Sequence, residues 1–336
     1  MRYRFWKFGL ASGFMGLFAG LLLFCVCATV FADGLPGVIS VSEDHRIKQW
    51  DSKGKAVATI GSHDEAINAA ALFAAPDGLQ IVTGDSAGTL KIWDVANAHL
   101  IFSQDDAHHG GIFAAAVSPD GKIIATGGAD RHIRLWRRDT GRRLADVEAH
   151  QDSVRALRFF MVGAEMRLLS GGADNIIRIW RVSATGNKGE LNYDSNIPAH
   201  DDAVTALALS PDGKSFASVS KDKMLKTWRV DGGGQENRSH ADRPLRSVAF
   251  SPDGKMIAVG DEDGHIRLYD AQKGSGLPIV MTQERGIFAL VFSADGKILV
   301  SGGEDRKIHY WDAATGKEKQ SVAAHDGAIT ALLLVP

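Results

Sequence analysis

The chain has 336 residues, with 38 Lys and Arg against 40 Asp and Glu and a formal charge of −2 at pH 7. It is 45% hydrophobic and 23% charged, which is typical of a folded domain and excludes a disordered or collagen-like chain. The balanced charge argues against a nucleic-acid binder, which needs a broad basic surface. Because Cys25 and Cys27 are the only cysteines, neither a disulfide framework nor a cysteine-based metal centre is expected.

Residues 1–32 have the layout of a secretory signal peptide, with cleavage expected after Ala32. Three cations among residues 1–7 precede Phe8–Phe31, which carry no charge. This uncharged stretch is also long enough to span a bilayer, so a retained membrane anchor is the alternative. Both outcomes predict an exported protein. The cysteine-free remainder favours an oxidising compartment, so we expect a bacterial periplasmic location, with or without an inner-membrane anchor.

The rest of the chain, residues 33–336, is a repeat. An aromatic residue ends an alternating apolar and polar segment at spacings of 43, 43, 44, 48, 41 and 42 residues. These spacings are near the period of a four-stranded propeller blade. The seven aromatic residues are Trp50, Trp93, Trp136, Trp180, Trp228, Tyr269 and Trp311.

Each repeat contains four short segments with strand character, separated by turn residues such as Ser210-Pro211-Asp212-Gly213. The pattern predicts an all-β, seven-bladed β-propeller with four antiparallel strands per blade. Residues 38–42 match the second strand of a repeat, with no first strand before them. Residues 329–335 match a first strand, with no second strand after them. We therefore expect the two segments to pair and close one blade. The predicted blades are 326–335 with 38–62, 63–103, 108–147, 150–197, 200–239, 243–282 and 285–323.

The repeated Trp-Asp pair resembles the signature of the WD40 repeat family. It stands at Trp50-Asp51, Trp93-Asp94 and Trp311-Asp312, with Tyr269-Asp270 as a variant. The resemblance covers residues 38–335 and implies a rigid, non-catalytic scaffold for protein partners. At Trp136, Trp180 and Trp228 the residue that follows is Arg instead of Asp.

The resemblance also implies a buried hydrogen-bond chain in each blade, made by a His, a Ser or Thr, an Asp and the Trp. Three blades depart from it, with Ala87 for the Asp, Val259 for the hydroxyl residue and Gln283 for the His, and we expect these blades to be looser or rearranged. The four complete sets are His325, Ser40, Asp44 and Trp50; His108, Thr126, Asp130 and Trp136; His150, Ser170, Asp174 and Trp180; and His200, Ser218, Asp222 and Trp228.

The His and Asp residues of these sets are interpreted as structural, because a catalyst needs one site and these recur around the ring. The sequence contains no catalytic motif of the kinds that mark hydrolases, zinc proteases or phosphate-binding loops. We therefore expect no catalytic residue, no metal and no cofactor. Alanine-rich first strands such as residues 69–71 and 114–116 favour close packing near the axis over a channel with reactive groups.

One face of the predicted ring is rich in acidic residues, because the loops before the first strands and the turns after the second strands carry them. Such a field steers the encounter with a partner. The candidate residues on this face flank the Asp of a set or its equivalent turn: Glu43, Arg131, Lys221, Glu262 and Glu304.

The sequence thus predicts an exported protein-interaction scaffold of the cell envelope with protein partners, no nucleic acid, and membrane contact only through residues 8–31 if they are retained. Two alternatives stay open. One is a propeller enzyme or a periplasmic carrier of a ligand or cofactor, and the other is a membrane-anchored envelope assembly factor.

Overall fold

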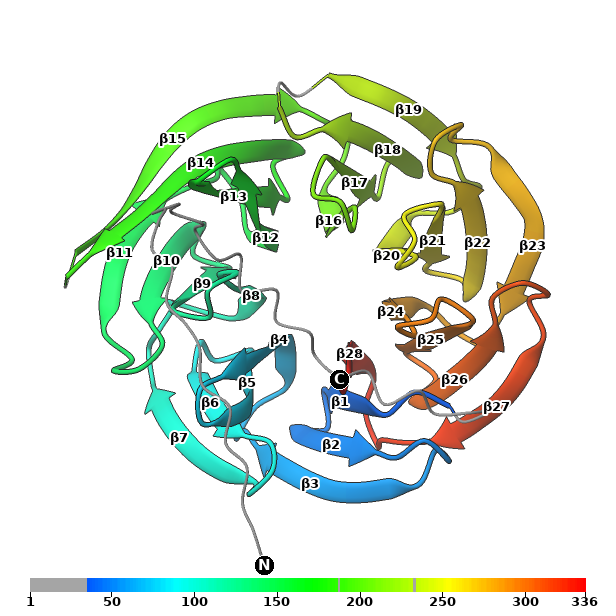
Figure 1. Ribbon diagram of the computed structural model, residues 1–336, viewed down its shortest axis with the longest axis horizontal. Coiled ribbons are helices and arrows are strands. Elements are labelled where there is room, and N and C mark those ends of the chain that lie inside the picture. Colours follow the sequence, from blue (N-terminus) through cyan, green and yellow to red (C-terminus); the bar gives the residue numbers. More distant parts are fainter. Residues whose placement is uncertain (1–34, 187, 232–233) are drawn as a thin grey trace, which may run out of the picture. The chain divides into compact units, whose positions relative to one another are not determined.

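The computed structural model describes residues 35–186, 188–231 and 234–336. Within these residues every regular element is a β-strand, and the strands form seven four-stranded antiparallel sheets. Figure 1 shows the sheets as blades around a common centre. The predicted fold class, a seven-bladed β-propeller, is confirmed. The predicted signal peptide, residues 1–32, lies outside the described residues.

The first strand of each blade lies innermost, and the second follows it outward (Figure 1). The first strands are β28 (Ile329–Leu334), β4 (Ile67–Ala75), β8 (Ile112–Val117), β12 (Val154–Val162), β16 (Val204–Leu209), β20 (Leu245–Phe250) and β24 (Ile287–Phe292). The second strands are β1 (Val38–Ser42), β5 (Gly78–Asp85), β9 (Ile123–Gly128), β13 (Glu165–Gly172), β17 (Ser215–Ser220), β21 (Met256–Asp261) and β25 (Ile298–Gly303).

The third strands carry the repeated aromatic residues, and the fourth strands form the outer rim. The third strands are β2 (Arg46–Trp50), β6 (Leu90–Asp94), β10 (His132–Arg137), β14 (Ile176–Thr185), β18 (Met224–Arg229), β22 (His265–Asp270) and β26 (Lys307–Asp312). The fourth strands are β3 (Ala56–Ser62), β7 (His99–Gln104), β11 (Arg143–Glu148), β15 (Lys188–Pro198), β19 (Gln235–His240), β23 (Gly276–Thr282) and β27 (Glu318–Ala323).

Both ends of the described chain build the first blade, whose strand order is β28-β1-β2-β3. Ser40 of β1 pairs with Leu332 of β28 on one side and with Lys48 of β2 on the other. The expected closure of one blade by the two ends is therefore confirmed, and it gives each blade a packed neighbour on both sides.

Local turn chemistry explains why the strands reverse where they do. Ser210 Oγ donates a hydrogen bond to Asp212 Oδ1 at 2.6 Å, and the same carboxylate accepts the backbone N–H of Lys214 at 3.0 Å. Gly213 completes the turn at a φ of 68°, which favours glycine. The turns at 118–121, 251–254 and 293–296 repeat the Ser-to-Asp hydrogen bond, so a local motif sets the first reversal of four blades.

The hydrophobic core is divided among the interfaces between blades. One cluster, for example, joins Ile39 and Ile47 of the first blade to Ile81 and Trp93 of the second. All of these side chains are buried, and each such burial stabilises the fold by roughly 1.5–3 kcal/mol. Because the core lies between the blades, the first strands, which are the inner edges of the sheets, face the centre of the ring (Figure 1).

Candidate functional site

The four complete hydrogen-bond sets of the sequence are joined in space. In the fourth blade Trp180 Nε1 donates to Ser170 Oγ at 2.9 Å, and this oxygen lies 2.8 Å from His150 Nε2. His150 Nδ1 lies 2.9 Å from Asp174. The sets around His108 and His200 have corresponding distances of 2.7–2.8 Å. In the first blade His325 reaches Ser40 and Asp44 across the two ends of the chain.

The protonation of these sets follows from their burial. Burial lowers the pKa of His108, His150, His200 and His325, and the carboxylate beside each ring offsets this only in part. Burial would raise the pKa of Asp174, but hydrogen bonds from His150, Gln151 and Arg178 outweigh it and hold the pKa well below the ordinary value. A neutral imidazole beside a carboxylate is a stable structural pair.

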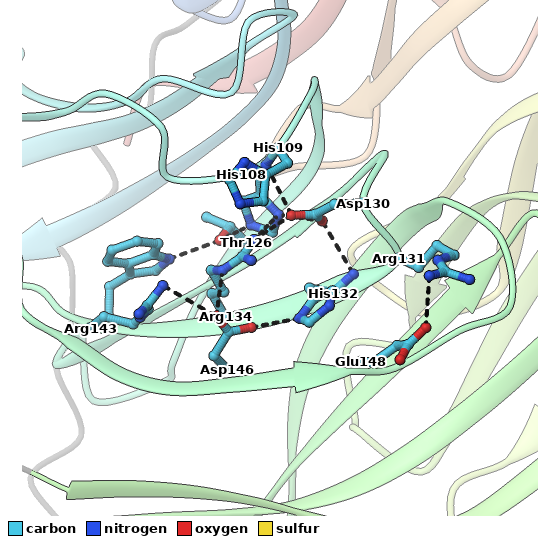
Figure 2. A network of polar contacts seen from close by, with 11 residues as sticks. His108, His109, Thr126, Asp130, Arg131, His132, Arg134, Arg143, Asp146 and Glu148 are labelled. Atoms are coloured by element: carbon cyan, nitrogen blue, oxygen red, sulfur yellow. Dashed lines mark hydrogen bonds and ion pairs between the residues drawn. The ribbon is translucent and has the colours of Figure 1, made fainter.

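A basic residue two positions before the Trp reinforces the set in the third blade. Figure 2 shows Asp130 between His108, the backbone N–H of His109 and Arg134. The Arg134 side chain is 6% exposed and also contacts Asp146 at 3.0 Å. These contacts occupy the acid and the base of the set, so they hold the blade together rather than leave a reactive group free.

The second blade corrects the sequence interpretation, which found no carboxylate because Ala87 stands at the expected position. Asp85, two residues earlier, lies 2.8 Å from His63 Nδ1, and His63 Nε2 lies 2.7 Å from Thr83 Oγ1. The same Asp85 accepts the backbone N–H groups of Ala87 and Thr89. The set is thus complete, but its carboxylate comes from Asp85 at the end of β5 instead of from the turn that follows.

The sixth and seventh blades are rearranged, as expected for blades that depart from the set. In the sixth, buried Asp261 accepts from Arg267 at 3.2 Å, whereas Asp263 is exposed and pairs with Arg243. In the seventh, Gln283 Oε1 accepts the hydroxyl of Ser301 at 2.7 Å.

The carboxylate of the seventh blade is met by a different imidazole. His309 Nε2 lies 2.8 Å from Asp305, and His309 Nδ1 lies 2.7 Å from Glu318. Burial works against a charge on His309, but the hydrogen bonds to both carboxylates outweigh it and raise the pKa of the imidazole. Nothing in the spacing of the motif predicted this contact.

A β-bulge recurs near the start of each first strand. In β12, for example, Val154 pairs with Gly172 and Ala156 with Gly171, so Arg155 is left unpaired between them. The six other blades skip the same strand position. Bulges re-aim side chains and are frequent beside functional sites. We call the seven skipped residues the bulge ring: Thr330, Asn68, Phe113, Arg155, Thr205, Arg246 and Phe288.

All seven residues of the bulge ring line one central cavity of about 350 Å³. Ala173, Ala203 and Lys221 complete its lining. These three residues belong to the turns after second strands and the loops before first strands, so the cavity opens on the face that the sequence singles out. A cavity with a few polar groups among apolar ones is typical of a binding site.

The polar groups of the bulge ring differ in whether they are already hydrogen-bonded to the protein backbone. Thr205 Oγ1 donates to the backbone oxygen of Leu245 at 2.8 Å, and Thr330 Oγ1 donates to that of Ile67 at 2.7 Å. Both hydroxyls therefore tie neighbouring blades together. The Arg155 guanidinium lies 4.2 Å from the ring centre of Phe113, within the range of a cation–π contact.

The five candidate residues of the predicted face are not brought together as one group. Lys221 lines the cavity, and Glu262 lies 3.4 Å from Arg246 of the bulge ring. Glu43 and Glu304 are exposed at the equivalent turns of their blades, where each backbone N–H donates to the loop before a first strand. Arg131 lies apart from these four and pairs with Glu148 at the end of β11, at 2.9 Å.

The bulge ring and its two arginines were not predicted from the sequence. The alanines of the first strands suggested close packing near the axis, and this interpretation is corrected by the cavity. The available signal was the second residue of each first strand, which varies from blade to blade while its two neighbours are apolar, with Ser247 as the exception. Within the described residues there is no group of three or more His, Cys, Asp or Glu side chains that could hold a metal ion.

The comparison with known families agrees with this architecture. The family described as "WD domain, G-beta repeat" matches six stretches that together cover more than half of the chain: residues 54–94, 101–137, 141–181, 192–229, 235–270 and 279–312. This chain belongs to the WD40 family. In the first blade, which both ends of the described chain build, only the fourth strand, β3, falls within these stretches.

Similar proteins come from several eukaryotes. Echinoderm microtubule-associated protein-like 2 of Homo sapiens is 28% identical over 58% of this chain and 29% of its own length. WD repeat-containing protein slp1 of Schizosaccharomyces pombe is 32% identical over 50% of this chain and 33% of its own. Nuclear distribution protein nudF of Aspergillus niger is 27% identical over 58% of this chain and 47% of its own. The chain thus spans less than half the length of these relatives.

These relatives correct the predicted location. From the sequence we expected an exported protein of a bacterial periplasm, but the relatives are eukaryotic proteins, two of them named for microtubules and for nuclear distribution. The expected periplasmic location is therefore wrong. None of the described residues forms a helix long and apolar enough to cross a membrane.

Proposed function

We propose that this WD40 propeller is a non-catalytic platform for protein partners, and that a segment of the partner enters the central cavity. The bulge ring carries the proposal, because seven separate strands turn a side chain into one cavity by the same backbone irregularity. The similarity to WD repeat proteins supports a binding role.

The turns around the cavity supply the rest of the proposed surface. Glu43 and Glu304 are exposed beside it, and Glu262 and Lys221 lie at its edge. The loops before the first strands add further exposed acids, among them Asp64, Glu65, Asp201 and Asp202. We propose that this acidic surround orients the partner, because a charged rim affects encounter and specificity more than affinity.

A photo-crosslinking experiment tests this function. A photoreactive phenylalanine analogue replaces either Asn68 or Phe288 of the bulge ring in the full chain. A control chain carries the analogue at Gln272, which is exposed in a turn at the opposite ends of the strands. In an extract of the cells of origin, crosslinks to a protein partner are expected from positions 68 and 288 and not from 272. Crosslinks confined to position 272 would contradict the proposed face.

A further inference from the structure

We propose that the central cavity binds an anionic side chain of the partner, a carboxylate or a phosphoryl group on an extended protein segment, through Arg155 and Arg246. This inference rests on the proposed function and names the chemistry of the partner. It follows from the positive charge of the cavity lining, from the few ion pairs that the two guanidinium groups make, and from the apolar rings beside them.

The lining of the cavity is basic, in contrast to its surround. Among the described residues it contains the cations Arg155, Lys221 and Arg246 and no carboxylate. Arg155 has no carboxylate oxygen within 4.0 Å in the described part of the chain, and its Nε donates to Ser153 Oγ at 2.9 Å. Burial lowers the pKa of Arg155, and the nearby charge of Arg246 lowers it further, against the opposing effect of Asp152. An anion between the two arginines would relieve this repulsion.

The second guanidinium is only partly satisfied. The Arg246 side chain is 35% exposed, and its single ion pair among the described residues is a long one of 3.4 Å to Glu262. Its Nε is buried without a hydrogen-bond partner there. The long ion pair and the partly exposed side chain leave the rest of the guanidinium available to an oxyanion in the cavity.

Aromatic rings fix the geometry of the site. Phe113 lies against the Arg155 guanidinium, and a stacked guanidinium keeps its edge free for two parallel hydrogen bonds to a carboxylate or phosphoryl group. Phe113 and Phe288 are both partly exposed in the cavity. They offer apolar contact to a residue next to the anion, so we expect the bound segment to carry an aliphatic or aromatic side chain there.

A third arginine extends the basic character along the same strand. Arg158 stands at the position after the residue that pairs with Ser170 in β12. In the other six blades this position is occupied by Ala, Val or Leu: Ala71, Ala116, Ala208, Ala249, Val291 and Leu333.

The Arg158 side chain is exposed to solvent. It donates a hydrogen bond to the backbone oxygen of Leu157 at 2.8 Å. It has no carboxylate within ion-pair distance in the described part of the chain. A cation placed where the other blades have small or apolar residues raises the positive potential at the inner edge of this blade.

The acidic surround limits which anionic segments can bind. Exposed acids such as Asp64, Asp201 and Glu304 would repel a segment that is acidic throughout. The preferred segment therefore has one central anionic residue beside an apolar one, with neutral or basic flanks.

Selection from a phage library of short random peptides on the immobilised full chain tests this proposal. We expect the enriched peptides to share one Asp or Glu next to an apolar residue. Enrichment of peptides without an acid would overturn the proposal, and so would the absence of binding both in this library and to peptides that carry phosphoserine.

The selected peptide is then measured by fluorescence anisotropy against three proteins. The chain with Arg155→Gln and Arg246→Gln should bind about 10- to 100-fold more weakly than the original chain, because two charge-assisted hydrogen-bond donors are lost. A control with Lys273→Gln and Lys317→Gln, which removes two exposed cations from the opposite turns, should bind normally. Equal affinity of the arginine variant and the original chain would overturn the proposal.

Two further peptides separate the possible outcomes. Phosphoserine in place of the acid tightens binding if the site prefers a phosphoryl group and weakens binding if it prefers a carboxylate. A neutral peptide whose binding is lost with Phe113→Ala would overturn the anionic site while leaving the binding platform itself intact. The proposed function is tested separately by the crosslinks from positions 68 and 288.

Discussion

The interior of the blades and the central cavity use the same repeat in opposite ways. In five blades a His joins the Trp-bound hydroxyl to a carboxylate, and the residues at these positions hardly change. At the bulge ring the backbone is the same in every blade, but the side chains are Arg, Phe, Thr and Asn. Repeated chemistry here stabilises the fold, whereas a repeated position with changing chemistry can define one binding site.

Loss of a carboxylate from a blade interior should give the largest effect on stability. Asp174→Ala leaves His150, Arg178 and the N–H of Gln151 without their acceptor. We expect a decrease of about 2–4 kcal/mol in the free energy of unfolding, measured by denaturant titration. Asp64→Ala, at an exposed acid of the face, should change it by less than about 0.5 kcal/mol. Equal effects of the two substitutions would remove the distinction between interior and face.

The seventh blade offers a way to rebuild the interior set. Gln283→His supplies the missing imidazole, and His309→Lys frees Asp305 and supplies the cation that β2, β6 and β18 carry at this position. The free energy of unfolding of the double variant should exceed the value expected from adding the two single-variant changes by at least about 0.5 kcal/mol. A double-mutant cycle of unfolding free energies measures this coupling, and strictly additive effects would show that the blade does not return to the common pattern.

The pH dependence of stability should also separate the blades. The pKa of His150 and the equivalent histidines lies below the ordinary 6.5, so their stabilisation is complete above 6.5 and is lost as the pH falls through the lowered values. The pKa of His309 lies above 6.5, so its contribution is complete below 6.5 and is lost as the pH rises through the raised value.

Comparison of the original chain with His309→Gln on either side of pH 6.5 checks this difference. The destabilisation caused by His309→Gln should be larger on the acidic side. His200→Gln should show the reverse, with the larger destabilisation on the alkaline side. The same pH trend in both variants would contradict the assignment of opposite pKa shifts.

The smallest effect is expected at the exposed edge of the third blade. Arg131 pairs with Glu148, and about half of each side chain is exposed. Since exposed ion pairs contribute little, Arg131→Gln should change the free energy of unfolding by less than about 0.5 kcal/mol. It should also leave the affinity for a cavity-binding peptide unchanged, because Arg131 lies away from the cavity. A clear loss of peptide affinity would extend the binding face to this edge.

The sequence predicted the features that recur along the chain. The seven aromatic positions and the Ser-Pro-Asp-Gly turns of three repeats were sufficient for the number of blades, and the segments 38–42 and 329–335 were sufficient for their closure. Asp85 was missed because its carboxylate reaches the same imidazole from two residues earlier, which only the path of the turn determines. The pairing of His309 was missed for a similar reason, since it depends on a cross-strand contact with Glu318.

The bulge ring was not predicted because a bulge is a property of strand register. In the sequence Arg155 and Arg246 are ordinary polar residues near the start of a strand, and nothing in one repeat indicates that they meet. Only closure of the ring brings residues from strands 91 positions apart into one cavity (246 − 155 = 91).

The most direct test measures stability and binding on the same preparations of two variants. With Arg155→Gln and Arg246→Gln, we predict that affinity for the selected peptide falls while the free energy of unfolding stays within about 0.5 kcal/mol of the original. With Asp174→Ala, we predict the opposite, a less stable protein whose folded fraction binds normally. If the arginine variant unfolds more easily and Asp174→Ala loses affinity, the division between a structural interior and a binding cavity is contradicted.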